Sequence, residues 1–190
     1  TDEVEVHDNV IYDVEGHAVF LEDGSEERNV ITRNLVVGTR RPLPGKEMLK
    51  SDNELDETQN RTPASFWITN PKNTFEDNVA ADTVGTGFWL IPPAEPLGLS
   101  AAEAAFDDRF PIKNQLISFK RNKAVVCASA FDMNDTINPF DEESINTNRG
   151  WTPQTATGDP APTQFLDDFQ SFACFSGLYT GIGDADVVFR

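Results

Sequence analysis

The chain has 190 residues, of which 32 are acidic and 15 are basic, and its formal net charge is −17. This length suffices for one substantial core or for one slice of a longer core. So acidic a chain is not expected to wrap nucleic acid or bind an anionic membrane, because both need dense Lys and Arg. Binding of an acidic polysaccharide would need a local basic patch or bound cations.

Short apolar runs, separated by Gly, Asn, Asp or Pro, predict β-strands along most of the chain. In chain order they are Val4–Val6, Val10–Tyr12, Ala18–Leu21, Asn29–Thr32, Leu35–Val37, Ser65–Thr69, Val79–Ala81, Gly87–Ile91, Leu116–Phe119, Ala124–Cys127, Phe169–Phe175 and Asp186–Phe189. Hairpin signals of the Asn-Gly type are absent, so antiparallel pairing of neighbours is not favoured. One helix is expected at Leu97–Phe106, with Ser100 as N-cap and Glu103 completing a capping box.

A pattern of Asn, Asp, Gly and Leu returns after 69 residues, and a looser third copy covers 169–179. The matching positions are Asn9, Asp13, Gly16 and Leu21 in the first copy and Asn78, Asp82, Gly85 and Leu90 in the second. Such repeats predict stacked units that share one elongated core. Asn tolerates left-handed corners, and its amide can bond to the Asn of the next unit. This structural role is expected for Asn9, Asn29, Asn34, Asn73, Asn78 and Asn114.

Three segments poor in apolar residues, 40–62, 92–111 and 134–162, are expected to project from the stack and wall a groove. Residues 1–190 are expected to form a single β-helix domain or a fragment of a longer one. Both ends of the chain resemble interior repeats, so flanking domains of a longer chain or self-association are expected partners. No apolar run is long enough to span a bilayer, so this segment is not expected to insert into a membrane.

Two stretches carry a resemblance to a known family. They are His7-Asp-Asn-Val-Ile-Tyr-Asp-Val-Glu-Gly-His17-Ala-Val-Phe-Leu-Glu-Asp-Gly24, followed by Glu27-Arg-Asn29, and Ser65-Phe-Trp-Ile-Thr-Asn-Pro-Lys-Asn73, continuing to Trp89. They resemble the right-handed parallel β-helix region shared by the cell-migration-inducing hyaluronan-binding protein, the transmembrane cell-surface hyaluronidase and fibrocystin-L. The resemblance covers roughly half of the chain and is strongest in residues 6–34 and 65–90. It implies an extracellular β-helix of a kind that handles glycans, with hyaluronan depolymerisation in some relatives.

Carboxylates on neighbouring turns of a β-helix can reach the separations used in glycoside hydrolysis. The dense polar segment 7–33 therefore suggests a hydrolase in which Asp13 acts with Glu22 or Asp23, and His17 is an alternative proton carrier. A lyase is the second enzymatic possibility, with Arg28 or Arg33 neutralising a uronate and His17 as base. The alternative is structural: exposed turns, surface ion pairs and a corner histidine would explain the same residues.

Further residues suggest binding. Trp151, in an Asn- and Pro-rich loop, is expected to be an exposed platform for a sugar ring, whereas Trp67 and Trp89 are expected in or near the core. Two basic sets could receive an acidic glycan, although solvated faces would also explain them: Arg40, Arg41 and Lys46, or Lys113, Lys120, Arg121 and Lys123. Asp132, Asn134 and Asp141 lie in an oxygen-rich segment that suggests calcium, although it lacks the spacing of an EF-hand.

Cys127 and Cys174 cannot form a disulfide framework, and they are either buried free thiols or one bridge between neighbouring turns. Sequons at Asn60 and Asn134 suggest a secreted or cell-surface glycoprotein. The predicted fold is an all-β, right-handed parallel β-helix of about four or five rungs. The predicted function is that of an extracellular protein that binds or cleaves a polysaccharide. The alternative is a non-catalytic structural or adhesive segment of a large extracellular protein.

Overall fold

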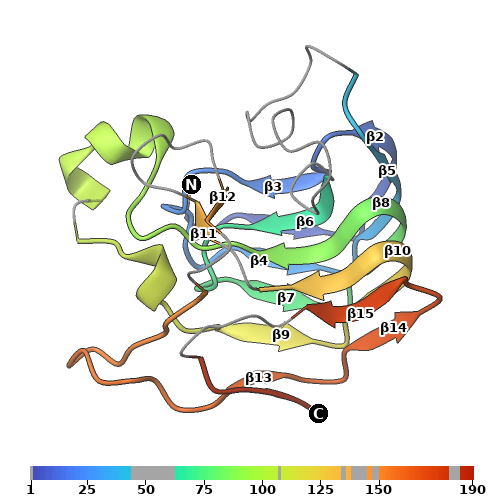
Figure 1. Ribbon diagram of the computed structural model, residues 1–190. Coiled ribbons are helices and arrows are strands. Elements are labelled where there is room, and N and C mark those ends of the chain that lie inside the picture. The colour runs from blue at the N-terminus through green and yellow to red at the C-terminus, as the bar shows by residue number, and fades with distance from the viewer. Residues whose placement is uncertain are drawn as a thin grey trace.

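The computed structural model of the protein (Figure 1) describes residues 2–43, 63–106, 108–133, 136–137, 145–146, 150–179 and 185–190. Within these ranges the secondary structure consists of β-strands and short 3-10 helices, without any α-helix. The all-β prediction is therefore confirmed. A search of the same ranges for a helix able to cross a bilayer finds none.

Two parallel sheets carry most of the strands. The first has the order β1-β4-β7-β9, with bounds Glu5–His7, Val30–Thr32, Thr74–Glu76 and Ser118–Lys120. The second has the order β14-β10-β8-β5-β2, with bounds Gln170–Phe172, Lys123–Asp132, Val79–Leu90, Leu35–Arg40 and Val10–Glu15. It is extended by β3 (Val19–Leu21), β6 (Ala64–Ile68) and β15 (Ser176–Tyr179). Two smaller pairs are β11 (Thr136–Ile137) with antiparallel β12 (Ile145–Asn146), and β13 (Gln164–Leu166) with parallel β16 (Val187–Phe189).

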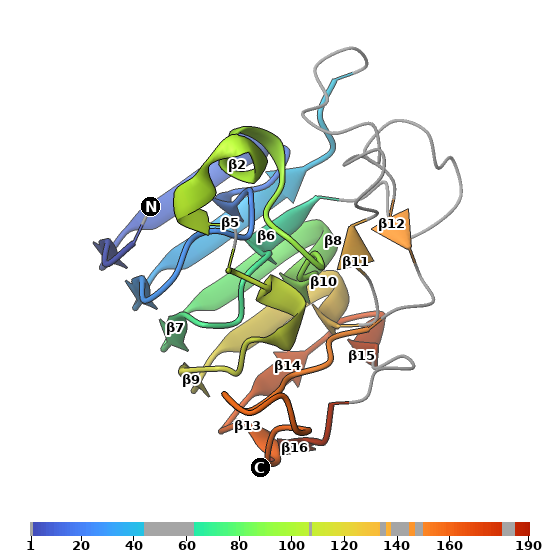
Figure 2. The ribbon, with the colours of Figure 1, turned by 90° about the vertical axis from the view of Figure 1, so that its left-hand side faces the viewer.

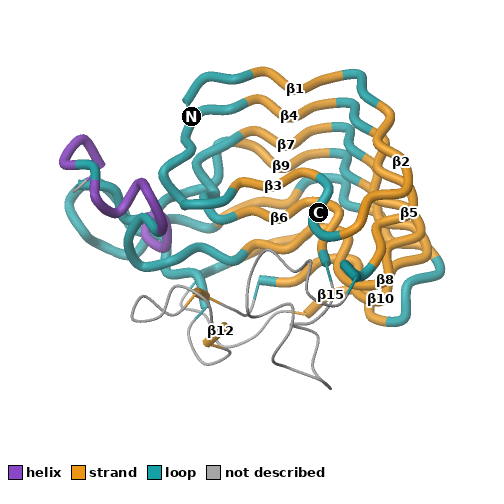
Figure 3. The backbone as a smooth tube through the Cα atoms, turned by 90° about the horizontal axis from the view of Figure 1, so that it is seen from above, coloured by secondary structure: helices purple, strands orange, loops and turns teal. Residues whose placement is uncertain are grey.

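The chain coils so that each strand of the first sheet leads into a strand of the second after a corner of two residues. β1 leads to β2, β4 to β5, β7 to β8, and β9 to β10. Figure 3 shows β1, β2 and β3 on three sides of one coil, and Figure 2 shows the coils stacked between the two termini. The parallel sheets agree with the predicted β-helix, whereas its handedness and number of rungs remain predictions.

Asparagine defines the corner between the two sheets. Each corner is a residue with positive φ followed by Asn: Asp8-Asn9, Arg33-Asn34, Asp77-Asn78 and Arg121-Asn122. The side-chain amides of Asn9, Asn34 and Asn78 donate to the amide oxygen of the next corner Asn, at 2.9 to 3.1 Å, and that oxygen also accepts the backbone N–H of the donor Asn. The predicted bonding between Asn side chains of neighbouring turns is confirmed. Asn122 also takes part in this column of asparagines, although it was not predicted from the sequence.

Aromatic side chains fill the interior between the sheets. Phe66 and Phe88 stack with ring centroids 4.5 Å apart, and Phe119 and Phe169 contact Phe88 edge-on. In-register parallel pairing produces such columns, because side chains of matched residues point to the same face. A second buried cluster contains Trp67 and Trp89, as expected from their strand-like surroundings.

The predicted helix at Leu97–Phe106 is wrong in type. The chain forms two 3-10 helices there, η2 (Gly98–Ala102) and η3 (Ala104–Phe106), separated by Glu103 in an extended conformation. Ser100 is not the N-cap, because it lies inside η2 and Leu97 precedes that helix; the Ser100 hydroxyl donates to Asp23 at 2.8 Å. The short strands β7 and β13, each of three residues, were not predicted, and the single strand β8 was predicted as two strands.

Candidate functional site

A polar groove lies beside the short 3-10 helix η4 (Pro111–Lys113). It consists of two cavities of about 570 Å³ and 280 Å³ that share Gln115, Leu116 and Ile117 in their walls. The larger one has the size of a typical ligand pocket. In Figure 1 the segment that precedes β13 runs on the same side of the molecule as η4. Residues of this segment also line both cavities and form the second wall of the groove.

Local sequence places a cation and an aromatic ring together in the larger cavity. Pro111 occupies the start of η4, where its fixed φ favours a helical turn and its missing N–H costs nothing. The resulting turn brings the Lys113 ammonium to 4.4 Å from the centroid of the Phe110 ring. The Phe110 ring is partly exposed and lines the same cavity. An aromatic ring next to an ammonium group suits an anionic sugar.

Trp151 anchors the opposite wall. Its indole is fully buried and its Nε1–H donates to the carbonyl of Asn114 at 2.7 Å. Beyond it, the N–H of Gln154 donates to the carbonyl of Lys113 at 2.8 Å, and the amide of Gln115 donates to the carbonyl of Gln154 at 3.0 Å. The prediction that Trp151 is an exposed sugar platform is therefore wrong, because a buried indole cannot contact a glycan. Its side chain positions residues 154–158 along the groove.

Two residues that line the larger cavity bind the buried carboxylate of Glu27. The Glu27 side chain is 5% exposed and accepts from the Lys72 ammonium at 2.8 Å and from the Asn114 amide at 3.2 Å. Lys72 and Asn114 both line the cavity. Asn114 also bonds to Asn70 at 3.0 Å, in line with its predicted structural role. The carboxylate of Glu27 thus holds one cation and one amide at the groove surface.

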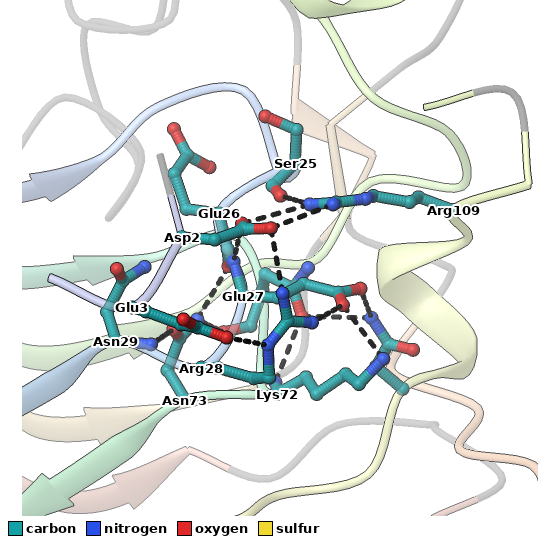
Figure 4. Close-up of polar contacts among 12 residues, drawn as sticks. Asp2, Glu3, Ser25, Glu26, Glu27, Arg28, Asn29, Lys72, Asn73 and Arg109 are labelled. Carbon is teal, nitrogen blue, oxygen red and sulfur yellow. Dashed lines mark hydrogen bonds and ion pairs between the residues drawn. The ribbon is translucent and has the colours of Figure 1, made fainter. Parts of the chain in front are cut away.

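The same network continues to the start of the chain (Figure 4). Arg28 contacts Asp2, Glu3 and Glu27 at 3.0 to 3.2 Å. Arg109 binds the Asp2 carboxylate with two N–H groups and holds the pKa of Asp2 at about 2. Arg28, which the sequence suggested for binding substrate, is thus held by three carboxylates outside the groove.

Two lysines of the groove lie beside acidic residues: Asp108 lines the larger cavity with Lys113, and Asp167 lines the smaller cavity with Lys120. No ion pair within the described part of the chain involves Lys113 or Lys120, which line the larger and the smaller cavity respectively. Arg190, at the far end of the smaller cavity, lies 3.8 Å from the Phe165 ring centroid and pairs with Asp167. Arg190 lowers the pKa of Asp167, and Lys120 adds to this effect, so Lys120 acts on that carboxylate from a distance without forming an ion pair.

The candidates for hydrolysis lie on different elements. Asp13, in β2 with a φ of +57°, pairs with the Arg40 guanidinium. Glu22 and Asp23 follow β3, and their backbone N–H groups both donate to the Glu26 carboxylate at 3.3 Å. Burial raises the pKa of Glu22, and the neighbouring Asp23 and Glu26 raise it further. The structure therefore groups Glu22 with Asp23 and Glu26 and gives Asp13 a separate partner.

The candidate base and the second candidate arginine have strong structural contacts. His17 is buried between Phe20 and Trp67, and its Nδ1 accepts the Ala64 N–H at 2.9 Å. Burial lowers the pKa of His17 to about 3. Arg33 holds Asp8 through two bonds of 2.7 Å, and this guanidinium keeps the pKa of Asp8 well below its ordinary range. His17 is thus a neutral core residue at physiological pH.

Of the three proposed calcium ligands, the structure describes only Asp132. Asp132 ends β10 with a fully buried side chain, whereas Asn134 and Asp141 lie outside the described residues. In the ranges that the structure describes, no group of three or more His, Cys, Asp or Glu side chains could hold a metal ion. Calcium binding by this segment remains a prediction, as does glycosylation at Asn60 and Asn134, which fall outside the same ranges.

Comparison with known proteins places the chain in a family. The model of the CEMIP beta-helix family matches residues 1–131, more than half of the sequence. The chain belongs to the CEMIP beta-helix family. This match confirms the resemblance seen in the sequence. The matched residues run from β1 into β10 and include η4 on one wall of the groove. They do not include residues 151–158 on the other wall.

Three curated relatives of the chain share 30% to 36% sequence identity with it. It is 36% identical to mouse Fibrocystin-L over 107 residues, which are 56% of this chain and 2% of the relative. It is 30% identical over 112 residues to human Cell surface hyaluronidase CEMIP2, and 34% identical over 109 residues to human Cell migration-inducing and hyaluronan-binding protein. Each of these two matches covers 50% of this chain and 8% of the relative. The chain therefore spans a small part of the curated relatives it matches.

Several groove residues were not predicted from the sequence, among them Lys72, Phe110 and Gln115. Lys113 and Lys120 were in a basic set, but that set also contained Lys123, which lines neither cavity. A local signal was available: Pro111 two residues before Lys113 predicts a tight turn that folds the lysine back over Phe110. Lys72 offered no such signal, because its partner Glu27 is distant in the sequence.

Proposed function

We propose that this CEMIP beta-helix chain binds an acidic polysaccharide of the hyaluronan type in the groove beside η4. The observation that carries the proposal is the position of Lys113 and Lys120, which form no ion pair with any described residue, along the groove of a chain whose net charge is −17. In so acidic a chain, a local group of cations is the basic patch that a uronate polymer requires. Two of the relatives are named for hyaluronan binding or hyaluronidase activity, which supports the same class of ligand.

The remaining groove residues fit a sugar. Gln115 and Gln154 provide amide groups that can bond to hydroxyls, and Phe110 provides a partly exposed apolar ring. The two cavities lie end to end and share a wall, as expected for a polymer that continues beyond one residue. An extracellular or cell-surface location is proposed on the same grounds, because two of the relatives are named as cell-surface hyaluronidases.

Replacing Lys113 by Gln should weaken binding of hyaluronan oligosaccharides about tenfold, since a charged contact contributes roughly 1.5 kcal/mol. Isothermal titration calorimetry at low salt would measure the change, and added salt should weaken binding of the unaltered chain. Lys123→Gln is the matched control, because Lys123 is exposed on β10 and lines neither cavity. Equal affinities of the two variants, or equal binding of neutral dextran, would contradict the proposal.

Cleavage is a second candidate function, favoured by the raised pKa of Glu22 beside Asp23 and Glu26. A carboxyl group whose pKa is raised is better suited to serve as a general acid in glycoside hydrolysis. If the chain depolymerises hyaluronan, Glu22→Gln should lower the rate at least a hundredfold, the usual contribution of general acid catalysis. Chromatography of the released oligosaccharides would measure the rate. Unchanged cleavage by the variant would reject Glu22, and with it the pairing of Asp13 with Glu22.

A further inference from the structure

The two cysteines of the chain occupy matching positions on neighbouring strands. β10 pairs in parallel with β14 through Val125 and Phe172, and with β15 through Ser129 and Ser176. Cys127 and Cys174 lie at the same register between these two pairings. The residue before each cysteine has a φ of +55°, so the backbone bends in the same way in both strands.

The structure holds both cysteines as free thiols, and the Cys174 sulfur lies close to the Cys127 backbone. The backbone N–H of Cys127 donates to the Cys174 Sγ at 3.4 Å. The Cys127 thiol donates to the carbonyl of Ala80 at 3.7 Å and the Cys174 thiol to the carbonyl of Ala124 at 3.5 Å, so each reaches toward the strand on the preceding side. Burial raises the pKa of Cys127 to about 11, and Cys174 contributes to this shift.

From this geometry we propose that Cys127 and Cys174 form a disulfide that joins two neighbouring turns of the coil. Matched residues on adjacent parallel strands have Cα atoms about 4.8 Å apart, within the roughly 4.4–6.8 Å that a disulfide spans. Disulfides persist in the oxidising compartments where secreted and cell-surface domains fold. The bond would fasten β10 to the β14–β15 edge, where Phe172 and Phe175 are exposed.

The chemistry needs a disulfide oxidant, for which oxidised glutathione serves. The Cys174 side chain is only partly buried, so its thiolate attacks a glutathione sulfur, forms a mixed disulfide and releases one reduced glutathione. The Cys127 thiolate then attacks the Cys174 sulfur and releases the second glutathione. Two protein thiols lose two protons and two electrons, and one oxidised glutathione becomes two reduced molecules.

The test compares the reduced chain with the chain equilibrated in oxidised glutathione. The oxidised monomer should have lost two hydrogens by intact mass, and a non-reducing digest should contain one peptide pair linked through Cys127 and Cys174. Because the bond closes a loop of 47 positions, the thermal midpoint should rise by roughly 10 °C. Cys174→Ala should show neither change, and it replaces the more exposed of the two cysteines.

The chain has only two cysteines, so an intramolecular bond must join this pair. Retention of both thiols by the folded oxidised chain would overturn the proposal. So would a mixture of glutathione adducts and covalent dimers without the linked peptide pair. A bridged chain whose midpoint is unchanged or lower would overturn it as well, since the bond would then not fit the native register.

Discussion

Replacing Asn78 by Ala should destabilise the chain by about 4 kcal/mol. The Asn78 side chain is fully buried, donates to the Ile31 carbonyl at 2.8 Å and to Asn122 at 3.1 Å, and accepts two bonds from Asn34 at 3.0 Å. Alanine would leave those groups without partners inside the protein, and each unsatisfied buried polar group costs roughly 1–3 kcal/mol. Urea unfolding followed by circular dichroism would measure the loss.

Asn9→Ala is the matched control for this prediction. Asn9 lies at the first corner, is exposed, and its side chain donates two hydrogen bonds without accepting one from another Asn. Its loss should cost about 1 kcal/mol or less, because water can replace the missing partners. If the two variants were equally stable, the asparagine column would not be a principal support of the fold.

Stability should fall by about 3 kcal/mol between pH 7 and pH 4.5 because of His17 alone. Burial lowers the pKa of His17 to about 3, whereas the unfolded chain has an ordinary histidine pKa near 6.5. Below pH 6.5 the unfolded chain therefore binds a proton that the folded chain does not, and acid favours unfolding. The contribution is fully present above pH 6.5 and is lost progressively as the pH falls toward 3. Urea unfolding at the two pH values would measure it.

His17→Gln should remove this part of the pH dependence, because glutamine does not titrate and can still accept the Ala64 N–H. His7→Gln provides the control, since the His7 side chain is 49% exposed and its removal should leave most of the pH dependence in place. If the His17 variant lost as much stability on acidification as the unaltered chain, the imidazole would not be buried in its neutral form.

The 69-residue repeat in the sequence corresponds to two turns of the coil. Asn9 and Asn34 are 25 residues apart, and Asn34 and Asn78 are 44 apart, which together make the observed spacing. The intermediate turn escaped notice because Gly38 stands where Asp13 and Asp82 stand in its neighbours, and because a long segment separates β5 from β6. Local sequence patterns thus predict the strand-forming residues and the corner asparagines. They do not predict how many residues each turn of the coil contains.

The site was less accessible to sequence reasoning, because its chemistry depends on contacts between distant segments. His17 resembles a catalytic residue in its local sequence, and only the packing of Trp67 shows that it is a core residue. Trp151 lies in a polar segment that suggests exposure, yet its side chain is buried and donates to the carbonyl of Asn114, 37 residues away in the sequence. The groove brings Lys72 beside Asn114 because both bind the Glu27 carboxylate, and no local pattern predicts contacts between segments so far apart in the sequence.

The most direct test of the groove is protection of lysines from chemical acetylation by a bound hyaluronan oligosaccharide, measured by peptide mass spectrometry. We expect Lys72, Lys113 and Lys120, which line the two cavities, to become less reactive. Lys123, outside both cavities, should react as before. Protection of lysines elsewhere, or of none, under conditions where the oligosaccharide is bound would contradict the assignment of the groove.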